Sequence, residues 1–238
     1  MPGEAGGPSQ YFDFLKVEPT DPCWVEVQRL RYEVYCEELN FLDPANYPEK
    51  LETDEFDPFS IQIAGINDEK QAVATLRLIR DSHLGFPLER HAPSLFESVR
   101  ELPRDKTVEV SRLILAKRYR RRANDGRYGT GGIEGDTRSR IGPAGQQRSS
   151  YPLILFGLFR VMFEESLNSG YQWWLAAMEP WLQAFLERFG FVFAPVGRPI
   201  EYYGHVVPYA ARIEDIFKAV AEMKPEVLQM VLGGGEAG

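Results

Sequence analysis

Hydrophobic and polar residues recur along the chain with two periods, one typical of helices and one typical of strands. Apolar residues at helical spacing follow the helix-start pair Asp21-Pro22 and predict a helix as far as about Leu39. Alternating residues on both sides of Asn67-Asp68 predict a β-hairpin. The same patterns predict strands over 60–66, 71–80, 107–115, 172–178, 191–196 and 200–207, and helices over 94–99, 151–169, 180–189 and 211–223.

The order of these elements predicts an α/β fold with one mixed sheet and helices on its faces. Strand 107–115, helix 151–169 and strand 172–178 form a crossover unit, which we expect to be right-handed. A ligand site is expected near the C-terminal end of strand 107–115, beside the N-terminus of the following helix.

Composition indicates one domain with loose ends. A hydrophobic content of 44% with 13% aromatic residues is sufficient for a packed core. We expect a flexible N-terminus over 1–10, a single domain over 11–232 and a flexible tail over 233–238. Within the domain, the segment 123–148 combines seven glycines with Arg, Ser and Asp, and predicts a mobile insertion.

Cysteine usage and hydropathy favour a cytoplasmic protein. The two cysteines, Cys23 and Cys36, fall in one predicted helix and are expected to stay reduced. The longest apolar run, 152–159, ends at Arg160 and is far shorter than the roughly 20 residues that span a bilayer. The N-terminal residues lack the pattern of a secretory signal. We therefore expect no membrane span.

The net charge of −8 conceals a basic segment. Residues 104–148 carry twelve Lys or Arg against five Asp or Glu. Such a segment indicates either a local anionic partner, such as a phosphate, a nucleotide or an acidic protein, or a solvated loop. A non-catalytic nucleic-acid-binding module is a further alternative, but the acidic balance of the whole chain and the lack of interleaved aromatic residues favour no nucleic-acid partner.

Charged residues on predicted strands are candidates for a functional site. Arg77, Glu109 and Arg112 interrupt otherwise apolar strand patterns. One interpretation of the two arginines is a structural ion-pair cluster, because buried charges persist mainly when they are paired. Its further members would be Arg31, Asp54 and Asp57. Glu109 is a candidate general base, since a desolvated carboxylate beside arginines can have a tuned pKa.

Amide formation from a thioester requires three functions that these residues can supply. The amine must lose a proton, for which Glu109 is the candidate acceptor. The carbonyl oxygen needs a donor as it becomes negative, and a backbone N–H within 113–115 can provide it. The acyl carrier must be held in place. The basic residues that we expect to hold it are Lys117, Arg118, Arg120, Arg121 and Arg122.

Several motifs in order resemble acyl-homoserine-lactone synthases. They are Arg31-Tyr32-Glu33-Val34-Tyr35 with Phe41, then Asp54-Glu55-Phe56-Asp57, Leu76-Arg77-Leu78 and Val108-Glu109-Val110-Ser111-Arg112. The second half looks closer to acyltransferases associated with exosortase/PEP-CTERM systems, which are relatives of the N-acyl amino acid synthases. That likeness rests on Met178-Glu179-Pro180, Leu186-Glu187-Arg188-Phe189-Gly190-Phe191 and Pro208-Tyr209. All three groups share the GCN5-related N-acyltransferase (GNAT) fold, with a mostly antiparallel sheet.

The resemblance implies roles for named residues of one acyltransferase domain. Glu109 would be the catalytic base, with Ser111, Arg112 and Arg77 completing the catalytic group. Residues expected to bind the acceptor are Arg31, Tyr35, Phe41, Asp54 and Asp57. Phe41 stands where the lactone synthases carry tryptophan, which weakens the expectation of S-adenosylmethionine as acceptor. The glycines of the acetyltransferase pyrophosphate loop are missing at the required spacing after Tyr119, which favours a carrier-protein donor.

These observations predict an N-acyltransferase that moves a long-chain acyl group onto the amine of an amino acid or similar small molecule. The donor would be the phosphopantetheine thioester of acyl-carrier protein, or acyl-CoA. The alternative within the resemblance is an acyl-homoserine-lactone synthase. The three histidines, His83, His91 and His205, are too scattered for a metal site, and no permanently bound cofactor is expected. Trp173 and Trp174 are expected in the core, while the small pair Ala176-Ala177 leaves room for an acyl chain.

Overall fold

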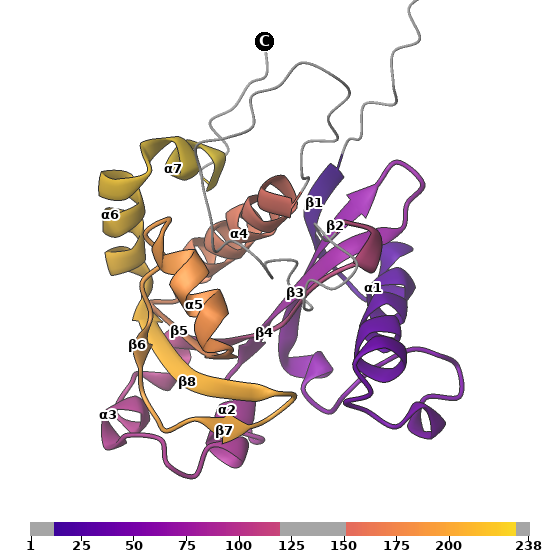
Figure 1. The fold of residues 1–238 in the computed structure, drawn as a ribbon, viewed down its shortest axis with the longest axis horizontal. Coiled ribbons are helices and arrows are strands. Elements are labelled where there is room, and N and C mark those ends of the chain that lie inside the picture. Colours follow the sequence, from indigo (N-terminus) through magenta and orange to yellow (C-terminus); the bar gives the residue numbers. More distant parts are fainter. Residues whose placement is uncertain (1–11, 120–150, 232–238) are drawn as a thin grey trace, which may run out of the picture.

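A central twisted sheet dominates the computed structural model, which describes residues 12–119 and 151–231 (Figure 1). The strand order is β1-β2-β3-β4-β5-β8-β6, and β7 pairs with β8 off this path. Every pairing is antiparallel except β4 with β5. The strands are β1 Phe12–Val17, β2 Ser60–Asn67, β3 Ala72–Arg80, β4 Thr107–Leu115, β5 Trp173–Met178, β6 Ala194–Pro195, β7 Ile200–Glu201 and β8 His205–Arg212. The predicted mixed, mostly antiparallel sheet is confirmed.

Helices cover both faces of this sheet (Figure 1). α1 packs against β3 on one face, whereas α4 packs across β1, β2 and β3 on the other. The α-helices are α1 Cys23–Tyr32, α2 Pro87–His91, α3 Glu97–Arg100, α4 Tyr151–Asn168, α5 Pro180–Glu187, α6 Ile213–Met223 and α7 Pro225–Val231. A π-helix, Glu33–Glu38, continues α1 without a break. Among the helices that the structure describes, none is both long and apolar enough to cross a membrane.

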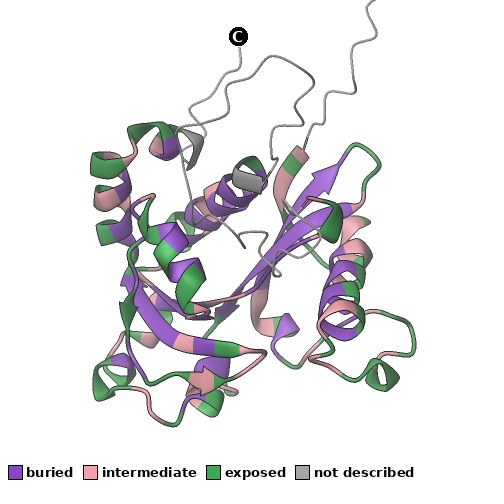
Figure 2. Ribbon diagram, viewed as in Figure 1, coloured by how far each residue is buried: buried purple, intermediate pink, exposed green. Residues whose placement is uncertain are grey.

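The largest hydrophobic cluster lies between the central strands and α4, α5 and α6. Figure 2 shows the middle strands as an almost continuous buried ribbon. Trp174 is fully buried there, and its indole Nε1 donates to Ser166 Oγ at 3.0 Å. The expectation that Trp174 is a core residue is confirmed, while Trp173 is half-buried. Neither Cys23 nor Cys36 forms a disulfide with a described residue.

Strongly periodic segments were predicted well. β4 has the expected bounds, and the hairpin β2–β3, helix α4 and strand β5 lie where their patterns indicated. The predicted crossover unit is present, because α4 lies between β4 and β5 in the sequence and these two strands pair in parallel. Asp21 does not cap the first helix, however. Its carboxylate instead accepts from the backbone N–H of Glu18.

The C-terminal third corrects the predicted elements. The expected strand 200–207 is a hairpin, because the chain reverses at Gly204, where φ is 106°. β8 then extends to Arg212 by pairing with β5, so the terminal helix begins at Ile213 and not at residue 211. Of the expected strand 191–196, only Ala194–Pro195 pairs. Pairing with distant strands decided these bounds.

Short or isolated elements were missed. β1 pairs with β2 at the sheet edge, and α2 and α7 are each only a few residues long. The helix expected over 94–99 is the shorter α3, Glu97–Arg100. The predicted flexible ends and the predicted insertion over 123–148 lie outside the described residues.

Candidate active site

A narrow cleft opens where β4 and β5 separate. The two strands pair only from Thr107 with Trp173 to Val110 with Ala176, and each continues beyond this point. The cleft has a free volume of about 80 Å³. One end is polar and is lined by Tyr35, Arg77, Glu109, Ser111, Arg112 and Tyr203, while the other is apolar and includes Phe159, Ala176, Ala177, Leu182 and Phe191.

A β-bulge in β4 shapes the polar end. Arg77 opposes Ser111 and Thr75 opposes Ile114, so one residue of β3 faces two residues of β4. Arg112, within this bulge, has φ 51°, a conformation that residues other than glycine rarely adopt. Bulges redirect side chains out of the regular strand alternation. The bulge thereby brings the Arg112 side chain to a cluster of carboxylates.

The same bulge leaves a backbone donor on the cleft side. The N–H of Ala116 donates to the carbonyl of Val73 at 2.8 Å. Alternation along an antiparallel strand then turns the N–H of Ile114 toward β3 and the N–H of Leu113 toward β5. Leu113 also lines the cleft. The strand geometry therefore makes the N–H of Leu113 the candidate donor within 113–115.

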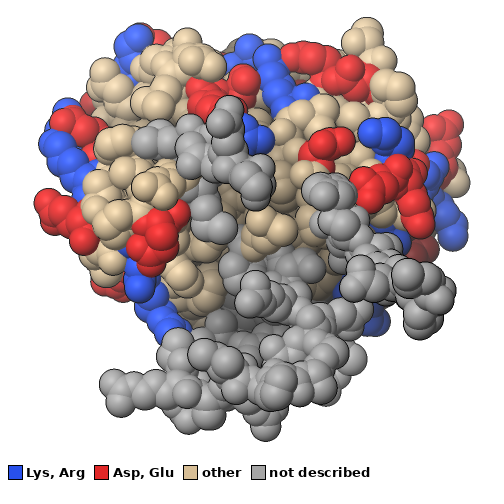
Figure 3. Space-filling model, turned by 90° about the horizontal axis from the view of Figure 1, so that it is seen from above, with Lys and Arg blue, Asp and Glu red and all other residues tan. Residues whose placement is uncertain are grey.

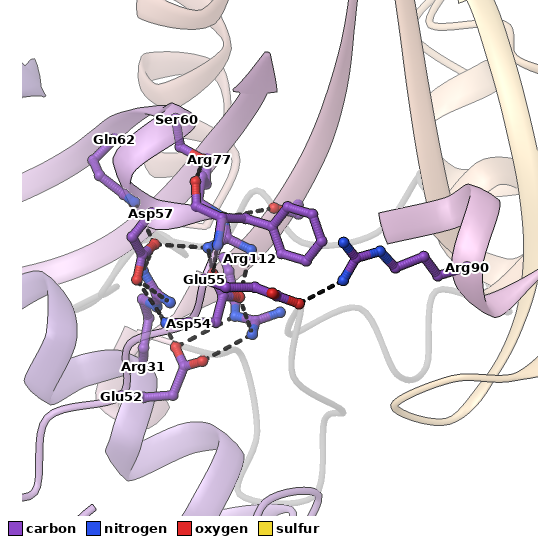
Figure 4. A network of polar contacts seen from close by, with 12 residues as sticks. Arg31, Glu52, Asp54, Glu55, Asp57, Ser60, Gln62, Arg77, Arg90 and Arg112 are labelled. Atoms are coloured by element: carbon purple, nitrogen blue, oxygen red, sulfur yellow. Dashed lines mark hydrogen bonds and ion pairs between the residues drawn. The ribbon is translucent and has the colours of Figure 1, made fainter. Parts of the chain in front are cut away.

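Arg31, on α1, is a fully buried member of a charge cluster (Figure 4). Its Nε pairs with Glu52, and its Nη1 and Nη2 reach the two oxygens of Asp57 at 2.8 and 3.2 Å. Gln62 Nε2 also donates to Asp57 Oδ1 at 2.9 Å. Glu52 comes from the loop after the π-helix and is fully buried.

Two further arginines complete the cluster. Arg77 binds both oxygens of Asp54 through Nη1 and Nη2, at 2.6 and 2.9 Å, and Asp57 Oδ1 at 2.7 Å. Its Nε donates to Ser111 Oγ at 3.0 Å. Arg112 Nη2 bridges Glu52 and Asp54 at 2.8 and 3.0 Å. Three guanidinium groups therefore face three carboxylates.

This pairing keeps the carboxylates ionised although they are buried. Burial acts to raise the pKa of Glu52, but Arg112 and Arg31 outweigh it and lower this pKa to about 2. Burial opposes ionisation of Asp54 as well, yet Arg77 holds the pKa of that carboxyl well below its usual value. The ion-pair cluster expected from the sequence is present, with Glu52 as a member that the sequence did not single out.

Glu109 differs from these carboxylates. It is 2% exposed, and its Oε2 accepts one hydrogen bond, from the Leu88 N–H of α2 at 2.9 Å. Among the described residues it forms no ion pair. Burial raises the pKa of Glu109 to about 8, although the Leu88 N–H and Arg77 act against this shift. At neutral pH this carboxyl is thus mostly protonated, and it becomes a base near the pH at which amines become neutral.

Aromatic rings enclose Arg112. Its guanidinium carbon lies 4.7 Å from the ring centre of Tyr35 and 5.3 Å from that of Tyr203. Tyr35 belongs to the π-helix, a feature frequent at functional sites. Phe41 contacts both tyrosines, with ring centres 6.2 and 5.9 Å away, but does not line the cleft. No local signal marked Tyr203, because its role depends on a hairpin that crosses the molecule.

Of the basic residues expected to hold the donor, the two that the structure describes do not line this cleft. Lys117 and Arg118 follow β4 on a 3-10 turn and line a separate surface depression with Glu26 and Arg29 of α1. Arg118 Nη2 donates to Gln71 Oε1 at 2.8 Å. Arg120, Arg121 and Arg122 lie outside the described residues.

Comparison with known proteins identifies the architecture. Residues 30–126 match the model of an acetyltransferase (GNAT) domain. The fold is that of a GNAT acyltransferase. The predictions of this fold and of an acyltransferase are therefore confirmed at this level. Comparison with curated protein sequences gives no significant match.

Solved structures of similar fold cover most of the chain. The CoA-dependent acyl-homoserine lactone synthase BjaI, with SAM and isopentyl-CoA, superposes with a TM-score of 0.58 at 17% identity, covering 85% of this chain and 81% of BjaI. The AHL synthase LasI gives 0.58 at 15% identity, covering 96% and 97%. FeeM, an N-acyl amino acid synthase from uncultured soil microbes, gives 0.55 at 13% identity, covering 90% and 96%. At such identities the likeness shows a common fold.

Proposed function

We propose that this chain is an N-acyltransferase that moves a long-chain acyl group from a thioester donor onto the amine of an amino acid or similar small molecule. The observation that carries this proposal is Glu109. It is a buried carboxyl whose pKa is raised to about 8, and it lines one cleft together with a polar group and an apolar group of side chains. A general base is most effective when its pKa lies near the working pH.

The reaction follows from the positions of these groups. The amine nitrogen attacks the thioester carbonyl carbon, and its proton passes to Glu109 directly or through water. The N–H of Leu113 stabilises the oxygen as it becomes negative. The C–S bond then breaks, the amide is released and the leaving thiolate takes up a proton. Arg77 acts as a positioning residue, since it ties Ser111 of β4 to the carboxylates of the 52–57 loop.

The apolar half of the cleft fits the acyl chain. The whole cleft has about 80 Å³ of free volume and a water-sized group needs roughly 10–15 Å³ of such space, so the apolar half alone holds fewer than about eight groups of that size. The small side chains of Ala176 and Ala177 leave this space open beside β5, and Leu182 and Phe191 bound it. Longer acyl chains would require some of these side chains to move.

The proposal includes two acyl donors, acyl-CoA and acyl-carrier protein. The BjaI structure was solved with isopentyl-CoA, which supports an acyl-CoA donor on the same fold. The basic residues after β4 support an acyl-carrier protein, because carrier proteins that are acidic would be attracted to them. An exosortase-associated role rests on the resemblance of the second half and belongs to the same proposal.

The alternative is an acyl-homoserine-lactone synthase, favoured by the structures of BjaI and LasI. The experiment that separates the two supplies octanoyl or palmitoyl thioesters of CoA and of acyl-carrier protein. Acceptors are a panel of amino acids and S-adenosylmethionine, and products are detected by mass spectrometry. We expect N-acyl amides from the amino acids. A lactone formed only with S-adenosylmethionine would decide for the alternative, and no acyl transfer from any donor would refute both.

A further inference from the structure

The tip of the β7–β8 hairpin lies at the polar end of the cleft. β7 pairs with β8 through Ile200 with Val206 and Glu201 with His205, so the turn is Tyr202-Tyr203-Gly204. Within it, the N–H of Tyr202 donates to the carbonyl of Gly204 at 2.9 Å, and Tyr203 has φ 51°. A bulky residue in this region is sterically disfavoured and persists only when surrounding contacts hold it.

Those contacts come from the opposite half of the molecule. The ring of Tyr203 meets Tyr35 of the π-helix edge-on, with centres 5.5 Å apart, and lies 5.9 Å from Phe41. It also covers the guanidinium of Arg112. In Figure 1 the hairpin reaches across the lower part of the molecule toward the region below α1 and β3.

Tyr202 anchors the other side of the tip. Its ring stacks on His91 of α2, with centres 4.0 Å apart and planes 15° from parallel. Tyr202 also lines the cleft together with Glu109. The turn is therefore held between α2 and the π-helix and forms a wall over the base and the bulge.

This wall borders the polar half of the cleft, which is where the acceptor amine would bind. If the acyl chain fills the apolar half, the reacting carbonyl lies between Glu109 and Leu113, and the amine approaches from the polar half. The carboxylates of Glu52 and Asp54 neutralise Arg112, which also hydrogen-bonds to the Tyr203 hydroxyl. What the Tyr203 ring adds is bulk in the space beside Tyr35.

We propose that Tyr203 is a specificity-determining residue that limits the acceptor to compact amines. The inference rests on the proposed function and goes beyond it by naming the residue that sets acceptor size. Removing the ring should enlarge the polar half and admit bulkier amines. A ring without its hydroxyl should preserve the limit.

The test measures kcat/KM with octanoyl-CoA for three amines of increasing size, namely glycine, L-phenylalanine and S-adenosylmethionine. Tyr203→Ala should shift the ratio of the largest to the smallest acceptor by roughly tenfold or more, the scale of specificity set by pocket volume. Tyr203→Phe should leave the ratio unchanged. So should the control His205→Ala, on the same hairpin, because His205 is exposed and contacts only Glu201 among the described polar partners. Tyr203→Leu serves if the alanine variant does not fold.

The outcomes are distinguishable. An unchanged acceptor ratio in a folded Tyr203→Ala or Tyr203→Leu variant would overturn the inference. An equal fall for all three acceptors would assign the ring a structural role and would overturn it as well. Wild-type protein that acylates none of the amines refutes the proposed function, and the inference fails with it.

Discussion

Glu109 combines near-complete burial with one hydrogen bond and no ion pair among the described residues, and this combination raises its pKa to about 8. Glu52 and Asp54, each bound to Arg112, have lowered pKa values and stay ionised. At the scale of single residues, the site therefore separates carboxylates that hold the scaffold from one that gains or loses its proton near pH 8. Two substitutions test this separation.

Replacing Glu109 with glutamine should remove the base and preserve the shape of the cleft. Loss of a general base lowers kcat by roughly 10²–10⁴-fold, and partial recovery is expected at high pH, where more of the amine is neutral. The wild-type rate should rise with pH toward about 8, as Glu109 loses its proton. The control is Glu55→Gln, an exposed carboxylate outside the cleft. A Glu109→Gln variant with near-normal kcat would show that Glu109 is scaffold.

Stability provides a second readout for the same variant. The folded state holds the Glu109 proton up to about pH 8, whereas an ordinary glutamate releases it near 4.5. Between these two pH values the unfolded state therefore binds fewer protons than the folded state. As the pH rises through this range, the free energy of unfolding falls by at most about 1.4 kcal/mol per pH unit. Glutamine does not titrate, so the Tm of the variant relative to wild type should increase from pH 5 to pH 8. A constant difference would contradict the raised pKa.

Glu52→Gln should act on stability in the opposite pH range. Removing one partner of a buried ion pair typically costs about 3–5 kcal/mol, because Arg31 and Arg112 lose a carboxylate. The pKa of Glu52 is lowered to about 2, so its stabilisation is present above the ordinary value of 4.5 and is lost as pH falls toward 2. Urea unfolding at pH 3 and pH 7 should show the larger penalty at pH 7. The control Glu55→Gln, in an exposed pair with Arg90, should cost under about 1 kcal/mol at either pH.

At the scale of elements, the edge strand β1 depends on two glycines. The ring of Phe14 lies between Gly65 of β2 and Gly157 of α4, and a Cβ on either glycine would overlap it. The guanidinium of Arg160 also reaches the carbonyl of Phe14 at 3.3 Å. β1 thus docks on α4 through a close approach that larger residues would prevent.

Gly157→Ala should therefore destabilise the protein, although alanine has a higher helix propensity than glycine. Alanine in a helix interior is normally favourable by about 1 kcal/mol over glycine, whereas overpacking costs about 1–3 kcal/mol. Hydrogen exchange should show faster exchange in β1, and urea unfolding should give the energy. In a Phe14→Ala background the same Gly157→Ala change should become neutral or stabilising. Equal effects in both backgrounds would exclude the ring contact as the cause.

At the scale of the whole molecule, β4 and β5 join two halves with different chemistry. The half before β5 supplies the three arginines and their carboxylates, and β5 together with the half after it supplies most of the apolar lining and the Tyr203 turn. On the face in Figure 3, acidic and basic side chains of the described residues are interspersed around the margin. The proposed docking of a carrier protein therefore rests on the arginines that follow β4.

Charge reversal tests this dependence. Replacing Arg118, Arg120, Arg121 and Arg122 with Glu should raise the KM for acyl-carrier protein at least about tenfold at low salt and leave the Tm unchanged, because electrostatic docking weakens with each lost charge. Acyl-pantetheine, which lacks the protein, is the matched control donor and should keep its KM. A variant that uses acyl-carrier protein as well as wild type at low salt would refute docking on these residues.

The sequence by itself determined the local elements and the polar residues they carry. Alternation of side chains across a strand is a local property, so β4 and its out-of-pattern Glu109 and Arg112 were evident without a structure. Motif order also indicated that Arg31, Asp54, Asp57 and Arg77 belong together, and the ion pairs agree.

Only the tertiary structure decided which distant residues complete the site. Glu52 joins the cluster because its loop brings the carboxylate into contact with Arg112. Tyr203 reaches Arg112 because β8 pairs with β5 and carries the hairpin across the cleft. The raised pKa of Glu109 likewise depends on burial by α2 and the sheet together. These features arise from strand register and from the separation of β4 and β5. Neither can be inferred from the pattern of hydrophobic and polar residues within one helix or strand.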